Sequence, residues 1–279
     1  MPELPEVETI RLDLQQCLPG LKITDVTVFD KRVLKSSDQA SFLRQIIGKT
    51  FCAVDRRGKM IVMPLKEGGY LLAHLKMTGQ LIYGGRMALK ETKVIFGLSN
   101  GKFLNYNDQR LFGRLTFVRQ LNEDSFLRDI GPEPFADEFN SGWIKDQLKR
   151  RRVPIKTLLM DQHFIAGIGN IYASEILFDA KISPKKAADR LSQSEIIALH
   201  RATIRVLKEA IQFRGTSMRN YRDSNGEKGS FINRIRVYNK ENKPCPVCSG
   251  EIKRIVQSGR STFYCQRCQQ IHAKTAKYI

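Results

Sequence analysis

Apolar residues near the start of the chain recur at the spacing of an α-helix, three or four residues apart. The residues of this series are Leu4, Val7, Ile10, Leu14 and Leu18. The series ends at Pro19-Gly20. Proline and glutamate precede it, and both favour a first helical turn, because proline lacks the surplus N–H and carboxylates complement the helix dipole. The pattern therefore predicts an amphipathic helix at the start of the chain.

The pattern then changes to the alternation of apolar and polar residues that is typical of β-strands. The segments that show it are residues 22–29, 49–54, 70–81, 93–98 and 102–106. Asn100-Gly101 lies between the last two segments and favours a tight hairpin turn. A β-rich first domain is therefore expected.

Residues 130–134, Ile-Gly-Pro-Glu-Pro, interrupt the strand pattern, and helical periodicity follows them. We place a domain boundary there. The expected helices cover residues 141–151, residues 154–161, a segment starting at Asn170, and residues 192–213. Residues 216–229 are polar and contain glycine, and a loop of this length is usually either functional or disordered.

The chain has 279 residues, enough for two domains, and carries a net charge of +19. This excess predicts a polyanionic partner. Nucleic acid is favoured over an acidic membrane because no basic amphipathic helix stands out, although a merely basic protein is the simpler alternative. Acidic residues occupy the N-terminus where a signal peptide would carry bases, and no apolar run is long enough to span a membrane. We therefore expect a cytoplasmic protein without membrane contact.

Four of the six cysteines form two close pairs near the C-terminus. The pairs are Cys245 with Cys248 and Cys265 with Cys268. This spacing fits one tetrahedral Zn²⁺ with four thiolate ligands, which is a closed structural site. In a reducing compartment metal binding is favoured over disulfides. Cys17 and Cys52 are then most simply small apolar packing residues.

The first residues could also carry chemistry. Removal of the initiator methionine would leave Pro2 as a secondary amine, and an unprotonated amine can attack an electrophilic sugar carbon. Glu3 would then be in reach to act as a general acid. The structural alternative is that both residues only begin the helix.

The first residues after methionine, PELPEVET, resemble the start of the formamidopyrimidine-DNA glycosylase family, bacterial enzymes of base excision repair. All eight letters are present. The resemblance implies that Pro2 attacks C1′ of a damaged deoxynucleotide and that Glu3 assists opening of the sugar ring. Leu4 favours the branch that acts on oxidised purines, because the related endonuclease VIII-like enzymes, which favour oxidised pyrimidines, usually have glycine there.

Three further segments of the first half match the same family. RRGK implies that Lys59 contacts the phosphate at the lesion and helps in strand cleavage. HLKMTG implies that His74 touches a phosphate and that Met77 enters the gap left by an extruded base, as a flexible apolar wedge would. DQRLFG implies that Arg110 pairs with the opposite base while Phe112 wedges beside it. By themselves, such residues are more often core residues or solvated charges.

The second half continues the match with GIGNIYA, in which glycines precede a helix starting at Asn170. Such a helix start can bind anions, although a lone Gly-x-Gly is a weak signal, and the resemblance implies that Asn170 is a phosphate ligand. Lys156 resembles a family lysine near the lesion and Arg151 aligns with a phosphate-side position, although either could be ordinary surface charge. Arg260, at the expected tip of the zinc hairpin, would grip the phosphate and act in the second elimination. Glu91-Thr92-Lys93 departs from the family's usual His-Asp-His, so no site is assigned there.

These observations predict an α+β protein with an N-terminal β-sandwich fronted by a helix, and a C-terminal helix–two-turn–helix domain with a zinc ribbon. The expected divisions are residues 1–133, 134–224 and 225–279. By resemblance, the polar loop would fold over the flipped base.

The expected function is that of a bifunctional DNA glycosylase/AP lyase. It would excise 8-oxoguanine and formamidopyrimidines through a Schiff base at Pro2, followed by β,δ-elimination. The expected partner is double-stranded DNA that contains oxidised purines or abasic sites, and nothing requires a dimer, so we expect a monomer. The alternatives are an endonuclease VIII-like enzyme for oxidised pyrimidines and a non-catalytic zinc protein that binds nucleic acid.

Overall fold

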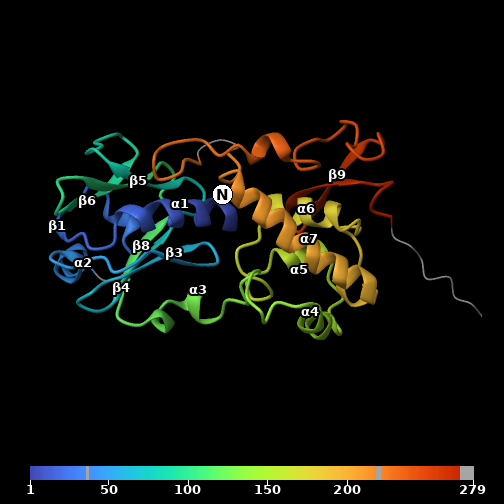
Figure 1. Ribbon diagram of the computed structural model, residues 1–279, viewed down its shortest axis with the longest axis horizontal. Helices are drawn as coiled ribbons and strands as arrows, with labels where there is room; N and C mark the ends of the chain where they lie inside the picture. Colours follow the sequence, from blue (N-terminus) through green and yellow to red (C-terminus); the bar gives the residue numbers. More distant parts are fainter. Residues whose placement is uncertain (36–37, 218–220, 271–279) are drawn as a thin grey trace, which may run out of the picture. The chain divides into compact units, whose positions relative to one another are not determined.

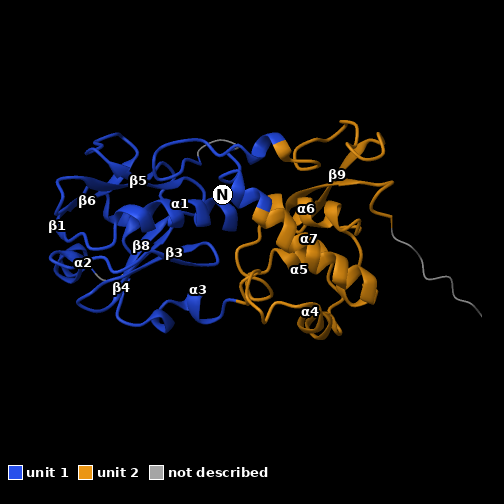
Figure 2. Ribbon diagram, viewed as in Figure 1, with its two compact units in different colours: residues 1–130, 209–233 blue, residues 131–208, 234–279 orange. Residues whose placement is uncertain are grey.

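The computed structural model describes residues 1–35, 38–217 and 221–270. The chain forms two compact units: residues 1–130 with 209–233, and residues 131–208 with 234–279 (Figure 2). The chain therefore leaves the first unit and later returns to it. The predicted three-way division of the sequence stays a prediction. Among the described residues, no helix is long and apolar enough to cross a membrane.

The first unit contains two four-stranded sheets with the strand orders β1-β6-β7-β5 and β2-β3-β4-β8 (Figure 1). All neighbouring strands are antiparallel. The strands are β1 (Ile23–Val28), β2 (Asp55–Arg57), β3 (Met60–Pro64), β4 (Tyr70–His74), β5 (Gly79–Gly84), β6 (Thr92–Leu98), β7 (Phe103–Asp108) and β8 (Arg114–Val118). The predicted Asn-Gly hairpin joins β6 to β7, and Gly101 adopts a φ of 79° in its turn.

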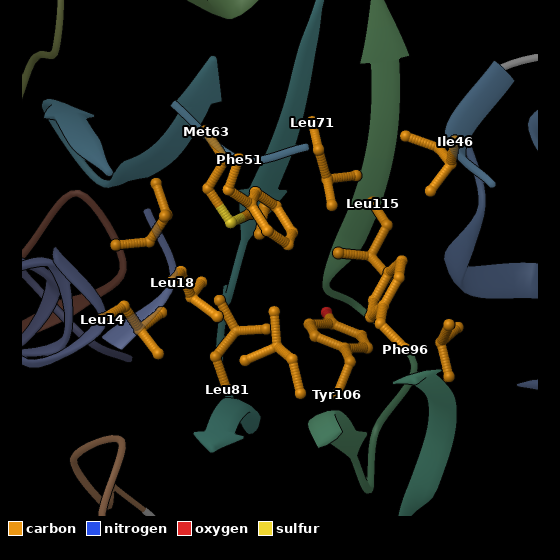
Figure 3. Close-up of a cluster of buried hydrophobic side chains, with 14 of the residues drawn as sticks. Leu14, Leu18, Ile46, Phe51, Met63, Leu71, Leu81, Phe96, Tyr106 and Leu115 are labelled. Atoms are coloured by element: carbon orange, nitrogen blue, oxygen red, sulfur yellow. The ribbon is translucent and has the colours of Figure 1, made fainter. Parts of the chain in front are cut away.

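The core of this unit lies between the two sheets. Leu71 and Leu115 of one sheet point toward Leu81 and Phe96 of the other (Figure 3). Helix α1 (Leu4–Cys17) contributes Val7, Ile10 and Leu14 of the predicted apolar face to the same core. The other short helices of the unit are η1 (Lys31–Val33), α2 (Gln39–Ile46), η2 (Leu121–Glu123) and α3 (Ser125–Arg128).

The strand predicted over residues 49–54 is wrong, because this segment makes only isolated bridges. Phe51 N donates to Leu21 O at 3.0 Å, whereas Cys52 N donates to Pro64 O at 2.9 Å. The backbone thus changes partner between adjacent residues, and no continuous ladder forms.

The second unit is mainly helical and ends in a two-stranded hairpin, as predicted. Its elements are α4 (Ser141–Leu148), α5 (Ile155–Leu159), α6 (Asn170–Asp179), η3 (Ala188–Arg190), most of α7 (Gln193–Gln212), the end of η4 (Phe231–Arg234), β9 (Ile252–Gln257) and β10 (Arg260–Cys265). Helix α4 ends before the predicted residue 151, because Arg150 turns the chain with a φ of 65°. Phe178 of α6 packs with Ile252 and Phe263 of the hairpin, so the helices and the hairpin share a core.

Candidate active site and zinc centre

Pro2 and Glu3 are both buried, directly before the first turn of α1. Glu3 is the residue that caps the helix, and its backbone N–H donates to Glu6 Oε2 at 2.8 Å. The structure therefore fixes the backbone of the predicted nucleophile and acid at the rigid start of a helix.

Glu6 also holds the segment that follows α7, and sequence reasoning did not single it out. Its Oε1 accepts from Thr216 N at 2.7 Å, and its carbonyl accepts from Tyr221 Oη at 3.3 Å. Gly215 has a φ of 74°, and a Cβ there would lie 2.7 Å from Glu6 Oε1. The described part of the polar loop is thus anchored beside the Pro2-Glu3 pair. A glutamate in the first helical turn gave no sequence signal for this, because a capping role explains it equally well.

Lys59 lies in the tight turn between β2 and β3, next to Gly58, which has a φ of 57°. Its side chain is buried rather than solvated, with 5 % of the residue exposed. Arg56 of β2 pairs with Glu8 of α1 at 2.8 Å. This ion pair fixes the hairpin that carries Lys59 to the helix that begins after Pro2.

His74 ends β4 and pairs across the sheet with Met60, the residue after Lys59, and with Arg114. Its Nδ1 accepts from Lys76 N at 3.1 Å. Burial, followed by the charges of Lys76, Arg114 and Lys59, lowers the pKa of His74 to about 2. A neutral imidazole therefore lies beside Lys59, Lys76 and Arg114, of which Arg114 is paired with Asp124 at 2.9 Å. The remaining positive charge favours binding of an anion. Lys76 and Arg114 were not among the predicted site residues.

Asp108 organises the loop that carries the predicted duplex-contacting residues. It is fully buried and accepts from Thr78 Oγ1 at 2.5 Å, from Arg110 N at 3.2 Å and from Gly113 N at 2.7 Å. One carboxylate thus joins the two turns that carry Met77, Arg110 and Phe112. Sequence reasoning missed this residue, although it begins the matched segment.

Met77 and Phe112 are exposed apolar side chains, with 40 % and 53 % of each residue accessible. The Arg110 guanidinium lies over the Phe112 ring at 4.6 Å from its centroid. Exposed apolar side chains beside a cation suit insertion into stacked bases.

Gly113 closes this loop where no larger residue fits. A Cβ there would lie 1.9 Å from Tyr106 Oη and 3.0 Å from the carbonyl of His74 (Tyr106 is labelled in Figure 3). The residue two positions earlier, Leu111, has a left-handed φ of 57°. The loop conformation therefore depends on the close approach of glycine to the core.

In the second unit, Lys156 of α5 is fully buried, so it is not the surface charge that the sequence left open. Its Nζ donates to Asn170 Oδ1 at 2.5 Å and to Thr262 Oγ1 at 2.8 Å. Asn170 Nδ2 donates to Ser261 O at 3.0 Å. This network joins the start of α6 to strand β10 of the hairpin.

Arg260 is the first residue of β10, directly before Ser261, and is exposed. The network around Lys156 therefore fixes the backbone that carries Arg260. Arg151 lies elsewhere: it is exposed, and its Nε donates to Gln147 O of α4 at 3.2 Å. The structure thus brings the side chains of Lys156 and Asn170 together with the backbone beside Arg260, whereas Arg151 lies outside this group.

The four predicted zinc ligands gather at the base of the hairpin, with their sulfur atoms within 4.8 Å of one another. Cys245 Sγ lies 3.8 Å from Cys268 Sγ, and Cys248 Sγ lies 3.4 Å from Cys265 Sγ. Thiolates at about 2.3 Å from one tetrahedral zinc ion would lie roughly 3.8 Å apart, so the cluster fits the metal. With four protein ligands the site is structural. Cys17 and Cys52 lie outside it. Cys17 packs against the core of the first unit, as expected, whereas Cys52 is exposed, so the expected packing role is wrong for Cys52.

Three family models match this chain. They are the formamidopyrimidine-DNA glycosylase N-terminal domain over residues 1–115, the H2TH domain of the same enzyme over residues 130–222, and a zinc finger found in FPG and IleRS over residues 242–271. With the sandwich, the helical unit and the four-thiolate hairpin, they define a zinc-containing DNA repair glycosylase.

Individual relatives cover nearly the whole chain. The formamidopyrimidine-DNA glycosylase of Pelotomaculum thermopropionicum is 44 % identical over 275 residues, which are 97 % of this chain and 100 % of the relative. The crystal structure of the Thermus thermophilus MutM (Fpg) protein matches with a TM-score of 0.87 and 37 % identity, over 96 % of this chain and 98 % of that one. Lactococcus lactis Fpg, in complex with DNA containing an abasic site, matches with a TM-score of 0.89 and 32 % identity, over 96 % and 100 %.

The chain belongs to the formamidopyrimidine-DNA glycosylase family. It is therefore a DNA repair enzyme of a glycosylase/AP lyase family, and its cysteine cluster holds one structural zinc ion. The alternative of a non-catalytic zinc protein is wrong.

Proposed function

We propose that this enzyme excises oxidised purines from double-stranded DNA and then cleaves the strand through a covalent intermediate at Pro2. The buried Pro2-Glu3 pair at the head of α1 carries the proposal. Solved complexes of Lactococcus lactis Fpg, whose structure this chain resembles, contain DNA with Fapy-dG or an abasic site. The cytoplasmic location expected from the sequence is part of the same proposal.

The first step would be attack of the Pro2 nitrogen on C1′, which forms an N–C bond as the glycosidic bond breaks. The electron pair of that bond leaves with the base, and the amine loses its proton. Glu3 would then protonate the ring oxygen, so that the sugar ring opens to an iminium ion. An α-amino group with a pKa of about 7.7–8.0 is partly unprotonated at neutral pH, which suits this role.

Two eliminations would follow from the iminium ion. Loss of a C2′ proton is coupled to cleavage of the C3′–O bond, and loss of the C4′ proton is then coupled to cleavage of the C5′–O bond, so that both phosphates depart and a gap is left in the strand. Lys59 and His74 would hold phosphate in the first unit, and Asn170 and Arg260 in the second, with Lys156 positioning Asn170. The charges of Lys59 and Arg260 would stabilise the departing phosphates, whereas the neutral side chains of His74 and Asn170 would contribute hydrogen bonds.

The base must leave the stack before attack, and this costs a few kcal/mol. Met77 and Phe112 are proposed to fill the space that it leaves, while Arg110 offers donors to the opposite base. The polar loop after α7, anchored on Glu6, is proposed to contact the extruded base.

Oxidised pyrimidines are a second candidate substrate class. One solved complex of Lactococcus lactis Fpg contains DNA with an oxidised pyrimidine, and it matches this chain with a TM-score of 0.89. Leu4, in place of the glycine usual in the endonuclease VIII-like branch, favours purines as the main class.

Borohydride trapping tests the proposal, because it reduces an iminium ion to a stable protein–DNA adduct. We expect wild-type protein with Met1 removed to be trapped on duplex DNA that contains 8-oxoguanine. Pro2→Gly, and protein that retains Met1, should lose trapping and base release by at least about a hundredfold. Their affinity for the duplex should change far less. Full activity of protein in which mass spectrometry verifies that Met1 is retained would contradict this mechanism.

A further inference from the structure

Arg214 makes an unusual pair of contacts directly after α7. It has a left-handed φ of 57°, and its Nη2 lies 2.6 Å from Asp13 Oδ2 of α1 and 2.5 Å from Asp223 Oδ2. Its Nε also donates to Asp223 Oδ2 at 3.0 Å. One guanidinium therefore joins the first helix to the polar loop, and neither the family match nor the proposed mechanism uses it.

The Asp223 side chain, 1 % exposed, shapes the loop around it. Its Oδ1 accepts from Asn225 N at 3.0 Å and from Glu227 N at 2.8 Å. This carboxylate thus links the turn at residues 223–227 to Arg214. An acceptor of two backbone N–H groups has a fixed orientation, so the guanidinium meets a rigid partner.

The two ends of the loop are also paired. Ser230 N donates to Phe213 O at 2.9 Å, and Phe231 N donates to Gly215 O at 3.0 Å. Gly229 approaches so closely that a Cβ there would lie 2.2 Å from Arg214 O. Arg214 therefore lies at the closed base of the loop.

Helix α1 holds this loop at two points. Asp13 follows Glu6 by two helical turns, so both carboxylates lie on one face of the helix. Glu6 binds Thr216 and Tyr221, and Asp13 binds Arg214. The contact between Asp13 and Arg214 therefore helps to hold the loop against Glu6. Glu6 lies three residues after Glu3, the proposed general acid.

We propose that Arg214, paired with Asp13 and Asp223, is a positioning residue that fixes the described parts of the loop, residues 213–217 and 221–231, on α1 and thereby sets the efficiency of damaged-base excision. This inference rests on the proposed function, in which the loop contacts the extruded base. Isolated surface ion pairs contribute little, but here two carboxylates, one of them nearly fully buried, share one planar guanidinium.

Hydrogen exchange of the DNA-free protein tests the anchor without any assay of activity. Arg214→Gly is the chosen variant, because glycine adopts a φ of 57° without strain and only the side-chain contacts are lost. The matched control is Arg32→Gly, which removes the same charge from an exposed pair with Asp30 in the same unit. We expect the amides of Asn225 and Glu227 to exchange about tenfold faster in Arg214→Gly than in the control.

Two DNA substrates test the consequence for the reaction. On duplex with 8-oxoguanine, kcat/KM of Arg214→Gly should fall about fivefold to tenfold relative to Arg32→Gly. On duplex with a preformed abasic site, where no base must be selected, the two variants should agree within about twofold. Arg214→Lys should recover only part of the loss, because an ammonium cannot serve both carboxylates in the fork geometry.

Asp13→Asn should lower excision in the same direction, and adding Arg214→Gly to it should cost little more. Unchanged exchange in Arg214→Gly would overturn the anchor, and equal losses on both substrates would overturn its link to base excision. If the wild-type enzyme releases no base from either oxidised purines or oxidised pyrimidines, the proposed function fails, whereas the exchange result still decides whether Arg214 holds the loop.

Discussion

A histidine with a strongly lowered pKa can contact a phosphate without carrying a charge. Nδ1 of His74 accepts a backbone hydrogen bond, so in the neutral ring the proton lies on Nε2. The single remaining N–H would make the proposed hydrogen bond to a phosphate oxygen, while Lys59 and Lys76 supply positive charge and Arg114 is paired with Asp124. At the residue scale, the proposed hydrogen bond to phosphate comes from the neutral His74, whereas the positive charge comes from other side chains.

The same pKa predicts how stability depends on pH. An unfolded histidine titrates near pH 6.5, whereas His74 in the folded protein titrates near pH 2. Between these values the unfolded chain binds a proton that the folded protein does not, so stability falls as pH decreases from 6.5. From pH 6 to pH 4, wild type should lose about 2.5 kcal/mol more than His74→Gln in urea unfolding. Parallel losses in the two proteins would show that His74 is protonated when folded.

At the scale of elements, most of the proposed site lies at turns and at the ends of helices and strands. The zinc hairpin shows why this matters, because the metal site lies at its base, whereas Arg260 is the first residue of its second strand, next to the turn. Four thiolates supply the folding energy that this short hairpin needs. Loss of one zinc ligand should therefore also weaken the phosphate contact that is proposed for Arg260.

Cys248→Ser should release the zinc ion and loosen the hairpin, so that affinity for lesion duplex falls about tenfold or more. The matched control is Cys52→Ser, which changes an exposed thiol outside the cluster and should keep both metal and affinity. Metal analysis and binding isotherms on both variants provide the test. Full zinc content in active Cys248→Ser would contradict the four-ligand assignment.

Elements with strong local signals were predictable from the sequence. The first helix, the Asn-Gly hairpin and the cysteine pairs depend on periodicity and spacing within a short stretch. The strand prediction for residues 49–54 failed because the hydrogen-bond partners change along this segment, and no local sequence pattern indicates such a change.

Long-range contacts explain the site residues that sequence reasoning missed. Asp108 accepts from Thr78, 30 positions earlier, and Glu6 accepts from Thr216, 210 positions later. The buried state of Lys156 depends on Thr262 in the same way. The family match supplied the names of catalytic and phosphate-binding candidates, but not the residues that position them.

At the scale of the whole molecule, the net charge of +19 makes a strong dependence of DNA binding on salt expected. Arg260 is proposed to bind phosphate, so Arg260→Ala should lower affinity on all duplexes and reduce the salt slope by about one unit. Phe112→Ala removes no charge. It should keep the slope and weaken binding of damaged duplex, since stacking is worth about 1–3 kcal/mol per base.

Binding isotherms over a salt series, on lesion and undamaged duplexes, separate these two effects. A smaller slope for Phe112→Ala, together with a change of lesion preference alone for Arg260→Ala, would reverse the two assignments.

The return of the chain to its first unit has a consequence for synthesis on the ribosome. Residues 1–130 emerge first, but residues 209–233 belong to the same unit, and Tyr221 is part of its core. The 78 intervening residues, 131–208, take about 4–16 s to translate at roughly 5–20 residues per second. During that interval the nascent sandwich lacks the segment that binds Glu6. The vicinity of Pro2 is therefore completed late, when most of the polypeptide has already been made.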